Sequence, residues 1–226
     1  MKLGAGKRAV SEEQKQARRN SVLVAAGDLF LQAGYFEVSM SMIAKKAGIA
    51  KGTIYIYFQT KEELFLSLLL SELGEWFENL RDELRKASVP LENNEFVEIL
   101  RDTFLHRIRL QRLISLMHLI LEKNVSYDEA FAFKRELLAL MRSTSPLIEK
   151  ALPYLPENGG NQVLIEFHSL LIGWSHITET SPIVERVQQH PEIQGLKFEL
   201  EDALFNSLSL VLDGMKYRSI RREITA

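Results

Sequence analysis

The sequence predicts an all-α protein, and three observations support this fold class. Apolar residues recur with a helical period in almost every segment. No stretch shows sustained strand-like alternation bounded by turn signals. Capping residues, glycines and prolines divide the chain into lengths that suit helices, about nine in number.

The bulk composition is that of an ordinary soluble globular protein. The chain has 226 residues, of which 46% are hydrophobic and 26% charged. It has no apolar run of about 18 residues, and its N-terminus lacks the apolar core of a signal peptide, so we expect a cytoplasmic protein that does not enter a membrane. The absence of cysteine excludes disulfides, thiolate zinc sites and cysteine nucleophiles.

The charge is distributed unevenly along the chain. Residues 1–62 contain 10 Lys and Arg against 5 Asp and Glu, a net charge of +5, whereas residues 63–226 have a net charge of −7. A basic head on an acidic body favours a polyanionic partner for the head. A chance clustering of solvated charges is the alternative.

The first helix is expected to start at the capping box Ser11–Gln14 and to stop at Gly34. Residues 1–10 before it should form a disordered basic arm that lies along phosphates or enters a minor groove. A solvated basic tail is the alternative interpretation for the six cations in and after this arm, which are Lys2, Lys7, Arg8, Lys15, Arg18 and Arg19.

Two short helices and a tight turn should follow. Ser39 is a suitable N-cap for a helix that reaches Ala47, and Gly48 ends it. The third helix has Ala50 at its N-cap and turns Ile54 and Phe58 inward. A second capping box, Thr60 with Glu63, then opens a long helix that runs to about Ala87.

The outer face of the third helix has an unusual composition. Gly52 lies at its centre, where a glycine costs roughly 1 kcal/mol of helix stability relative to alanine, so close approach of another surface is a reason for it. Small, hydroxylated, aromatic and basic residues on such a face are typical of a helix-turn-helix that reads the DNA major groove. Lys51 suits a guanine edge or a phosphate, and Ile56 suits a thymine methyl group. The hydroxyl groups of Thr53, Tyr55 and Tyr57 suit hydrogen bonds to phosphates. Lys61, in the first turn of the next helix, suits another phosphate.

The segment "IAKKAGIAKGTIYIYFQTKEELF" resembles the pattern "IA..AGVS.GTLY.HF.SKEEL" of the tetracycline-repressor (TetR) family, and the resemblance covers about residues 18–67. It implies a helix-turn-helix DNA-binding domain at residues 11–60 and a helical effector-binding and dimerisation domain at 61–226. Two positions depart from the pattern, because Ala50 replaces a frequent capping serine and Met42 a frequent acidic residue. The implied DNA contacts are Ser39, Lys51, Gly52, Thr53, Tyr55, Ile56, Tyr57 and Lys61.

The same resemblance implies a function. The chain would be a ligand-responsive transcriptional regulator, most simply a repressor, whose homodimer binds a palindromic operator and is released by a largely apolar small molecule. We expect no enzymatic activity and no cofactor. An all-α enzyme and a helical adaptor for protein partners are the alternatives, but no nucleophile elbow, phosphate-binding loop or carboxylate dyad supports the enzyme.

Beyond the long fourth helix we expect helices near 94–108, 109–122, 126–146, 161–178 and 198–217. Residues 153–161 should be an exposed loop, and the connection that contains Pro182 and Pro191 should be irregular or briefly helical. The helices 161–178 and 198–217 are apolar on more than one face, so we expect them to form a four-helix dimer interface.

The effector pocket is expected among bulky and polar side chains of the middle helices. For each of them ordinary core packing is the alternative, since methionine and aromatic stripes usually belong to a core. His168 and His176 are too far apart for one-turn metal ligation, so no metal is predicted. Arg107, Arg109 and Arg112 suit either an acidic ligand head group or a solvated face. The pocket candidates are Trp76, Phe104, Met117, His118, Leu121, Phe131, Phe167, His168 and Trp174.

Overall fold

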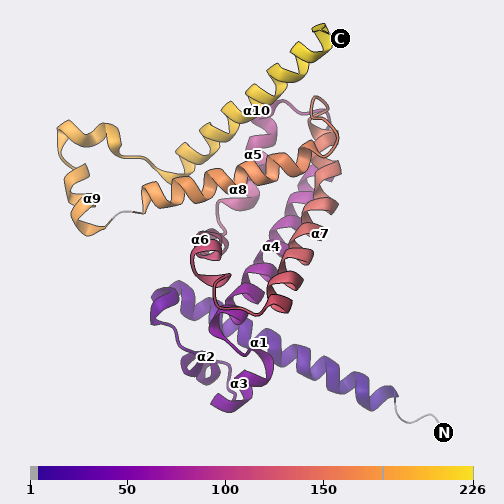
Figure 1. Cartoon of the computed structure of the whole chain (residues 1–226), viewed down its shortest axis with the longest axis vertical. Coiled ribbons are helices and arrows are strands. Elements are labelled where there is room, and N and C mark those ends of the chain that lie inside the picture. The colour runs from indigo at the N-terminus through magenta and orange to yellow at the C-terminus, as the bar shows by residue number, and fades with distance from the viewer. Residues whose placement is uncertain (1–4, 180, 226) are drawn as a thin grey trace. The chain divides into compact units, whose positions relative to one another are not determined.

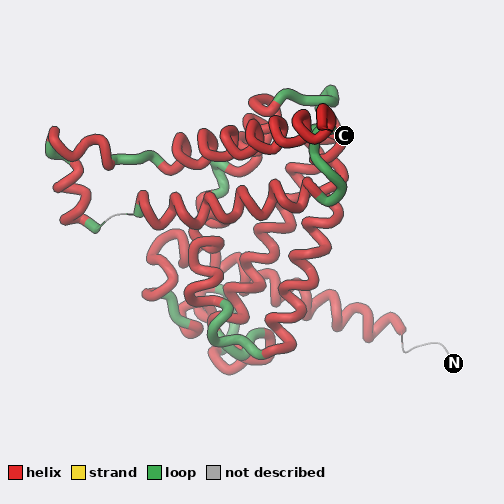
Figure 2. Tube along the Cα trace, turned by 45° about the horizontal axis from the view of Figure 1, so that its top comes forward, coloured by secondary structure: helices red, strands yellow, loops and turns green. Residues whose placement is uncertain are grey.

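The structure of the chain is a computed structural model that describes residues 5–179 and 181–225. Within these ranges it contains ten α-helices, a π-helical segment and a 3-10 segment, and no strand (Figures 1 and 2). The predicted all-α class is confirmed. The expected number of about nine helices is slightly low because the connection after residue 178 forms short helices of its own.

The chain divides into two compact units. Unit 1 comprises residues up to Glu72 together with Leu116–Phe133, and unit 2 comprises Leu73–Ser115 and Lys134–Ala226. The division differs from the predicted boundary between residues 60 and 61. The reason is that the first turns of α4 (Lys61–Lys86) belong to the core of unit 1, where Phe65 meets Phe30 of α1 (Ala5–Glu37) with ring centroids 5.6 Å apart.

Unit 1 contains α1, α2 (Met40–Lys46), α3 (Lys51–Tyr57), the start of α4, the π-helix (Met117–Leu121) and the start of α7 (Tyr127–Ala151). The predicted stop at Gly34 is confirmed, because this residue leaves the helical conformation with φ 80° and ψ 171°. The predicted start at Ser11 is wrong, since α1 begins at Ala5. Lys7, Arg8 and Ala9 are good helix formers, so the helix continues through the capping-box residues instead of starting there.

Unit 2 contains the rest of α4 and α7, with α5 (Asn93–Phe104), α6 (Ile108–Leu116), α8 (Gly159–Thr178), α9 (Pro182–Gln188), the 3-10 segment (Pro191–Leu196) and α10 (Leu200–Thr225). Helices α8 and α10 lie side by side, and α10 also packs on α5 (Figure 1). Helix α9 lies apart from α8 and α10 and buries none of its residues, so the expectation of a briefly helical connection is confirmed.

Helix α7 runs past the proline that was expected to end it. Pro146 lies inside the helix, which continues to Ala151. A proline removes one backbone donor, but Ile148 and Ala151 beyond it are completely buried, and this burial favours continuation of the helix. Helix α10 likewise extends past the expected residue 217 to Thr225.

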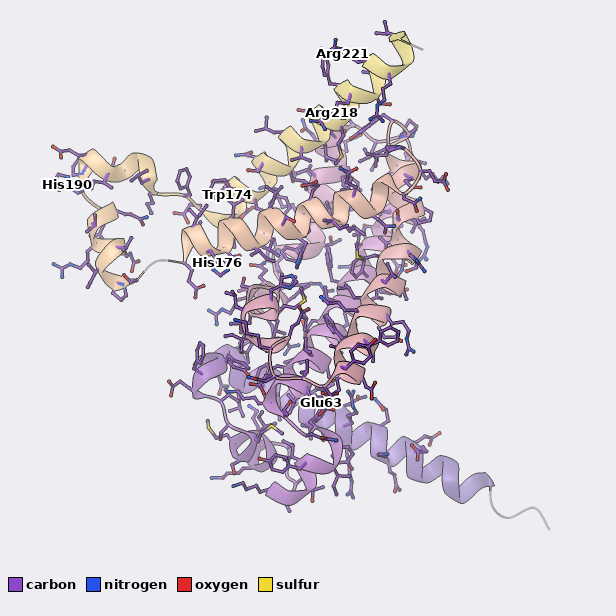
Figure 3. All side chains as sticks on the ribbon, viewed as in Figure 1. Glu63, Trp174, His176, His190, Arg218 and Arg221 are labelled. Atoms are coloured by element: carbon purple, nitrogen blue, oxygen red, sulfur yellow. The ribbon has the colours of Figure 1, made fainter. Side chains whose placement is uncertain are left out.

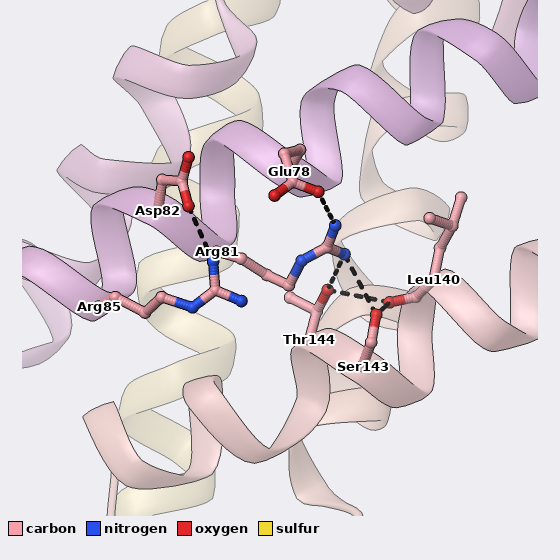
Figure 4. Close-up of polar contacts among 7 residues, drawn as sticks. All are labelled: Glu78, Arg81, Asp82, Arg85, Leu140, Ser143 and Thr144. Carbon is pink, nitrogen blue, oxygen red and sulfur yellow. Dashed lines mark hydrogen bonds and ion pairs between the residues drawn. The ribbon is translucent and has the colours of Figure 1, made fainter.

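A buried arginine joins α4 to α7 inside unit 2 (Figure 4). The Arg81 side chain donates to Ser143 Oγ at 3.1 Å and to Thr144 Oγ1 at 3.3 Å, and it pairs with Glu78 Oε2 at 2.6 Å. The residue is only 8% exposed. Because a buried guanidinium requires partners, these contacts set how α4 and α7 meet at this level of the unit.

None of the described helices combines the length and the apolar character that crossing a bilayer requires.

Candidate nucleic-acid interface

The turn between α2 and α3 is built as the sequence predicts. The Ser39 side chain accepts a hydrogen bond from the Met42 N–H at 3.3 Å and so caps α2. Gly48 has φ 68°, a left-handed conformation that glycine adopts without strain, and the Ile49 N–H returns to the Ala44 carbonyl at 3.0 Å. The tight turn therefore fixes how α3 leaves α2.

Helix α3 has one buried and one exposed face. Ile54 and Phe58 are completely buried, as predicted. On the opposite face Ile56 is 72% exposed and Tyr55 45% exposed, beside exposed Lys51. Thr53 and Tyr57 are half-buried at the flanks of this face. We call Lys51, Gly52, Thr53, Tyr55, Ile56 and Tyr57 the α3 outer face.

Gly52 is not required by packing within the described chain. A Cβ atom built on this residue meets nothing within 4 Å, and its φ does not lie in the left-handed region. The glycine therefore leaves the centre of the α3 outer face open, which would let a second molecule approach the helix backbone.

The predicted phosphate contact Lys61 has a partner inside unit 1. Its ammonium donates to the Tyr35 carbonyl oxygen and lies 4.0 Å from the centroid of the Tyr35 ring. Burial lowers the pKa of Lys61, while Glu62 and Glu37 act in the opposite direction. The Tyr35 hydroxyl donates to Glu62 at 2.9 Å, and burial together with this carboxylate raises the pKa of Tyr35. Sequence reasoning missed Tyr35, whose only signal is its position directly after the helix-ending Gly34.

Arg19 of α1 contacts both α4 and the residue that ends α3. It donates to Ser67 Oγ at 2.8 Å and lies 4.7 Å from the centroid of the Phe58 ring, so it is not simply part of a solvated tail. Burial lowers the pKa of Arg19. Lys2 lies outside the described residues, and so do the side chains of Lys7 and Arg8, which completed the predicted basic arm.

The second predicted capping box is present at the start of α4. The Glu63 N–H donates to Thr60 Oγ1 at 3.0 Å, and the Glu63 carboxylate accepts from the Gln59 N–H. Burial raises the pKa of Glu63, with the nearby Glu129 carboxylate acting in the same direction. The α4 N-terminus is therefore satisfied by side chains of unit 1.

Three of the pocket candidates form an aromatic cluster in unit 2. The Trp76 ring centroid lies 5.2 Å from that of Phe104 and 5.7 Å from that of Phe167, and the two phenylalanines are 5.0 Å apart. Phe77 and Phe205 extend the cluster. All five rings are buried, which fits the alternative of ordinary core packing, and an effector pocket among them stays a prediction.

The other pocket candidates do not join this cluster. Met117 and Leu121 are buried in the π-helix of unit 1. His118 is exposed and contacts Glu122 at 3.1 Å, and Phe131 is 56% exposed and stacks on Tyr127. Both residues lie on outward helix faces, so neither suits an apolar interior, in contrast to our expectation.

The remaining candidates are partly accessible. His168 and Trp174 are half-buried on α8, where Figure 3 labels Trp174. Trp174 Nε1 donates to Ser207 Oγ at 3.0 Å. In the basic run, Arg107 donates to the Thr103 carbonyl at 3.2 Å, and Arg112 is exposed. Within residues 5–179 and 181–225, no three or more His, Cys, Asp or Glu side chains form a group that could hold a metal ion.

Comparisons with known proteins show which protein family the chain resembles. A family model described as "Bacterial regulatory proteins, tetR family" matches residues 22–68, and one described as "Tetracyclin repressor-like, C-terminal domain" matches residues 70–219. The fatty acid metabolism regulator protein of Bacillus subtilis is 32% identical over 80 residues, which cover 35% of this chain and 41% of that protein. The transcriptional activator FasR of Mycolicibacterium smegmatis is 31% identical over 83 residues, 37% of this chain and 38% of that protein. The matched segments thus span about two fifths of these relatives.

Solved structures show the same fold over most of the chain. The fatty acid degradation regulator FadR from Bacillus halodurans superposes with a TM-score of 0.55 at 18% identity, covering 86% of this chain and 94% of its own. FadR from Bacillus subtilis, solved in complex with stearoyl-CoA, gives a TM-score of 0.51 at 18% identity, with coverages of 85% and 96%. The expectation of a regulator and not an enzyme is confirmed by the family models, which together match most of the sequence: the chain belongs to the tetR family of bacterial regulatory proteins.

Proposed function

We propose that the chain is a DNA-binding transcriptional repressor whose homodimer binds a palindromic operator and leaves it when a small molecule occupies the helical core of unit 2. The α3 outer face carries this proposal. Its apolar opposite side is buried, while Lys51, Tyr55 and Ile56 are exposed around an open glycine. A solvent-exposed face that combines these side chains has the chemistry of a groove contact.

Each side chain of the face has a role in this proposal. Lys51 donates to a guanine edge or a phosphate, and Ile56 contacts a thymine methyl group. The hydroxyls of Thr53, Tyr55 and Tyr57 bind phosphates and hold the register. Ser39 contributes by capping α2, which positions α3. Lys61 would have to leave the Tyr35 carbonyl to reach a phosphate, so we assign it the weakest contribution.

The dimer is proposed to form through α8 and α10. Both helices expose large apolar side chains although they pack on each other, as shown by Ile165 and Ile177 on α8 and by Leu210 on α10. An isologous interface made from two copies of each helix would cover these residues. Two-fold symmetry would also present two α3 helices to two half-sites, which multiplies the specificity of one short helix.

The effector is proposed to be a largely apolar small molecule. The aromatic cluster of unit 2 offers apolar surroundings, and two relatives are named for fatty-acid regulation. Binding would act on DNA affinity only through a different affinity for the two functional states of the dimer. Helix α4 supplies residues to both units, so a shift of this helix is the proposed link.

The test is selection of bound sequences from a random duplex pool, followed by gel-shift titration with the recovered duplex. Recovery of a two-fold symmetric sequence is expected. Lys51→Ala and Tyr55→Ala should each weaken binding about tenfold or more. Lys150→Ala on α7 of unit 2 removes the same charge from another exposed position and should change affinity far less.

The salt dependence provides an independent check. Contacts to phosphates make the affinity fall steeply as salt rises, and Lys51→Ala should reduce the slope of log K against log salt by about one. Unchanged binding by the α3 variants, with native helicity and dimerisation, would disprove the assigned face.

A further inference from the structure

The aromatic cluster of unit 2 contains a polar atom with no role in packing. Trp76 is 3% exposed, and among the described residues its indole N–H has no hydrogen-bond partner. The neighbouring rings of Phe77, Phe104 and Phe167 supply no oxygen or nitrogen acceptor. A buried donor without an acceptor lowers the stability of the folded state, so a structure that keeps one indicates a ligand that supplies the acceptor.

The second indole of the chain shows what an ordinary solution looks like. Trp174 donates its Nε1–H to Ser207 Oγ at 3.0 Å while its ring packs 5.4 Å from that of Phe198. A single hydroxyl on the neighbouring helix α10 is thus enough to accept the hydrogen bond of an indole N–H. At Trp76 no described residue supplies such an acceptor, so a bound molecule could supply it.

A hollow lies next to the cluster. It has a volume of about 410 Å³ and shares Phe104 and Phe205 with the cluster. Its wall includes the apolar Leu171 and Leu200, the amide Gln111 and three carboxylates, and no basic side chain. The carboxylates are Asp202, Glu201, which pairs with Arg101 at 2.9 Å, and Glu199, which pairs with Lys197 at 3.3 Å. Phe104 therefore contacts both places: it lines the hollow, and its ring centroid lies 5.2 Å from that of Trp76.

From these observations we infer that Trp76 is the hydrogen-bond donor of the effector site, and that the effector is a neutral, largely apolar molecule with a carbonyl-type oxygen. The Trp76 N–H binds that oxygen among the aromatic rings. Because no basic side chain lines the hollow, an anionic molecule that enters it would find no counter-charge among the lining residues. This inference rests on the proposed function, because it names the ligand chemistry of the same regulator.

The test uses three probes of nearly equal size. Acetophenone is neutral and has a carbonyl oxygen, isopropylbenzene has the same shape without an acceptor, and benzoate is an anion. The chain has two tryptophans, so a ¹⁵N–¹H spectrum of the full-length labelled protein contains two indole signals, and Trp174→Phe assigns them. Acetophenone should move the Trp76 indole proton downfield, as hydrogen bonding does, whereas isopropylbenzene should not.

Affinities then separate a binding role from a packing role. Trp76→Phe keeps an aromatic ring and removes the N–H; it should weaken acetophenone binding about tenfold and leave isopropylbenzene binding within about twofold. Benzoate should bind the unmodified protein more weakly than acetophenone. Equal losses for both neutral probes, an unmoved Trp76 signal, or preference for benzoate would overturn the inference.

DNA binding distinguishes this inference from the function on which it rests. Without any probe, the unmodified protein should bind the selected duplex. If the variant and the unmodified protein bind no duplex, the proposed function fails, whereas normal DNA binding with no effect of Trp76 on the probes removes only the inference. If Trp76→Phe unfolds, Phe104→Leu is the second variant: it should keep the downfield shift with acetophenone, and loss of that shift would overturn the inference.

Discussion

The α3 outer face of unit 1 and the corner between α7 and α8 in unit 2 both contain a glycine, and the surroundings of the two glycines are opposite. At Gly52 a Cβ atom would meet nothing within 4 Å. At Gly160 it would lie 2.4 Å from the Ser145 carbonyl oxygen and 2.6 Å from Ser145 Oγ. The corner is also tied by Glu149, which accepts from Ser145 Oγ and from the Gly160 N–H.

This difference separates two uses of a residue without a side chain. At Gly160 the chain itself fills the space, so the glycine serves the fold. At Gly52 the space stays open, and no contact within the described chain offsets the conformational cost of a glycine in a helix. In our proposal, contact with the DNA backbone or bases offsets this cost. Substitution of each glycine by alanine tests the contrast.

Gly160→Ala should have the largest effect on stability. Because the new methyl group overlaps backbone atoms of α7, we expect a loss of about 2–3 kcal/mol in the free energy of unfolding. Chemical denaturation followed by circular dichroism measures it. Gly173→Ala on the same helix is the matched control, since a Cβ there meets nothing within 4 Å and should not destabilise the protein. Equal stability of both variants would contradict the close approach of α7 and α8.

The Arg81 contact between α4 and α7 should have the next largest effect. Arg81→Met removes a buried donor to Ser143 and Thr144 and should cost about 2 kcal/mol. Arg85→Met, one turn later, removes only an exposed pair with Asp82 and should change stability by no more than about 0.5 kcal/mol. Thermal or denaturant unfolding of the two variants decides, and similar losses would show that Arg81 adds nothing beyond a surface charge.

A pH experiment examines the polar contacts of α5 in unit 2. The Tyr154 hydroxyl donates to Asn93 Oδ1 at 2.7 Å, and burial and the Asp213 carboxylate raise its pKa from 10.0 to about 12, against the Asn93 contact. A raised pKa means that the folded state favours the protonated hydroxyl, so this stability is complete below pH 10 and is lost as the pH rises to about 12.

Tyr154→Phe should therefore cost about 1 kcal/mol near neutral pH, and the difference from the unmodified protein should shrink above pH 10. Unfolding free energies at pH 8 and pH 11 provide the comparison. A difference that grows with pH would show the opposite sign of the pKa shift.

Gly52→Ala should have the smallest effect on stability and the most informative one. We expect a gain of at most about 1 kcal/mol, because alanine is the better helix former and the site is open. Operator affinity should nevertheless fall, since the methyl group occupies the space proposed for the DNA. A stabler protein with undiminished operator binding would remove the functional reason for this glycine.

Sequence reasoning predicted unit 1 closely because its signals are local. Ser39, Gly48 and the Thr60 capping box are found where the pattern places them, and Ile54 and Phe58 are buried as predicted. Each of these depends on neighbours a few residues away. The contacts of Lys61 with Tyr35 and of Arg19 with Ser67 were not predicted, because they join residues 26 and 48 positions apart.

Unit 2 was predicted less completely for the same reason. The aromatic residues Trp76, Phe104 and Phe167 were singled out, but helical spacing alone could not separate them from Phe131, which is exposed. Pro146 was read as a helix end, whereas the buried residues beyond it keep α7 helical.

The amino-acid sequence by itself determined the all-α class, the helix-turn-helix and the polarity of the α3 helix, because caps, turns and helical periodicity act over a few residues. The tertiary structure alone decided which aromatic rings meet around Trp76, how Arg81 is satisfied and which cations remain accessible. Those outcomes depend on side chains that are distant in sequence and become neighbours only when the helices pack.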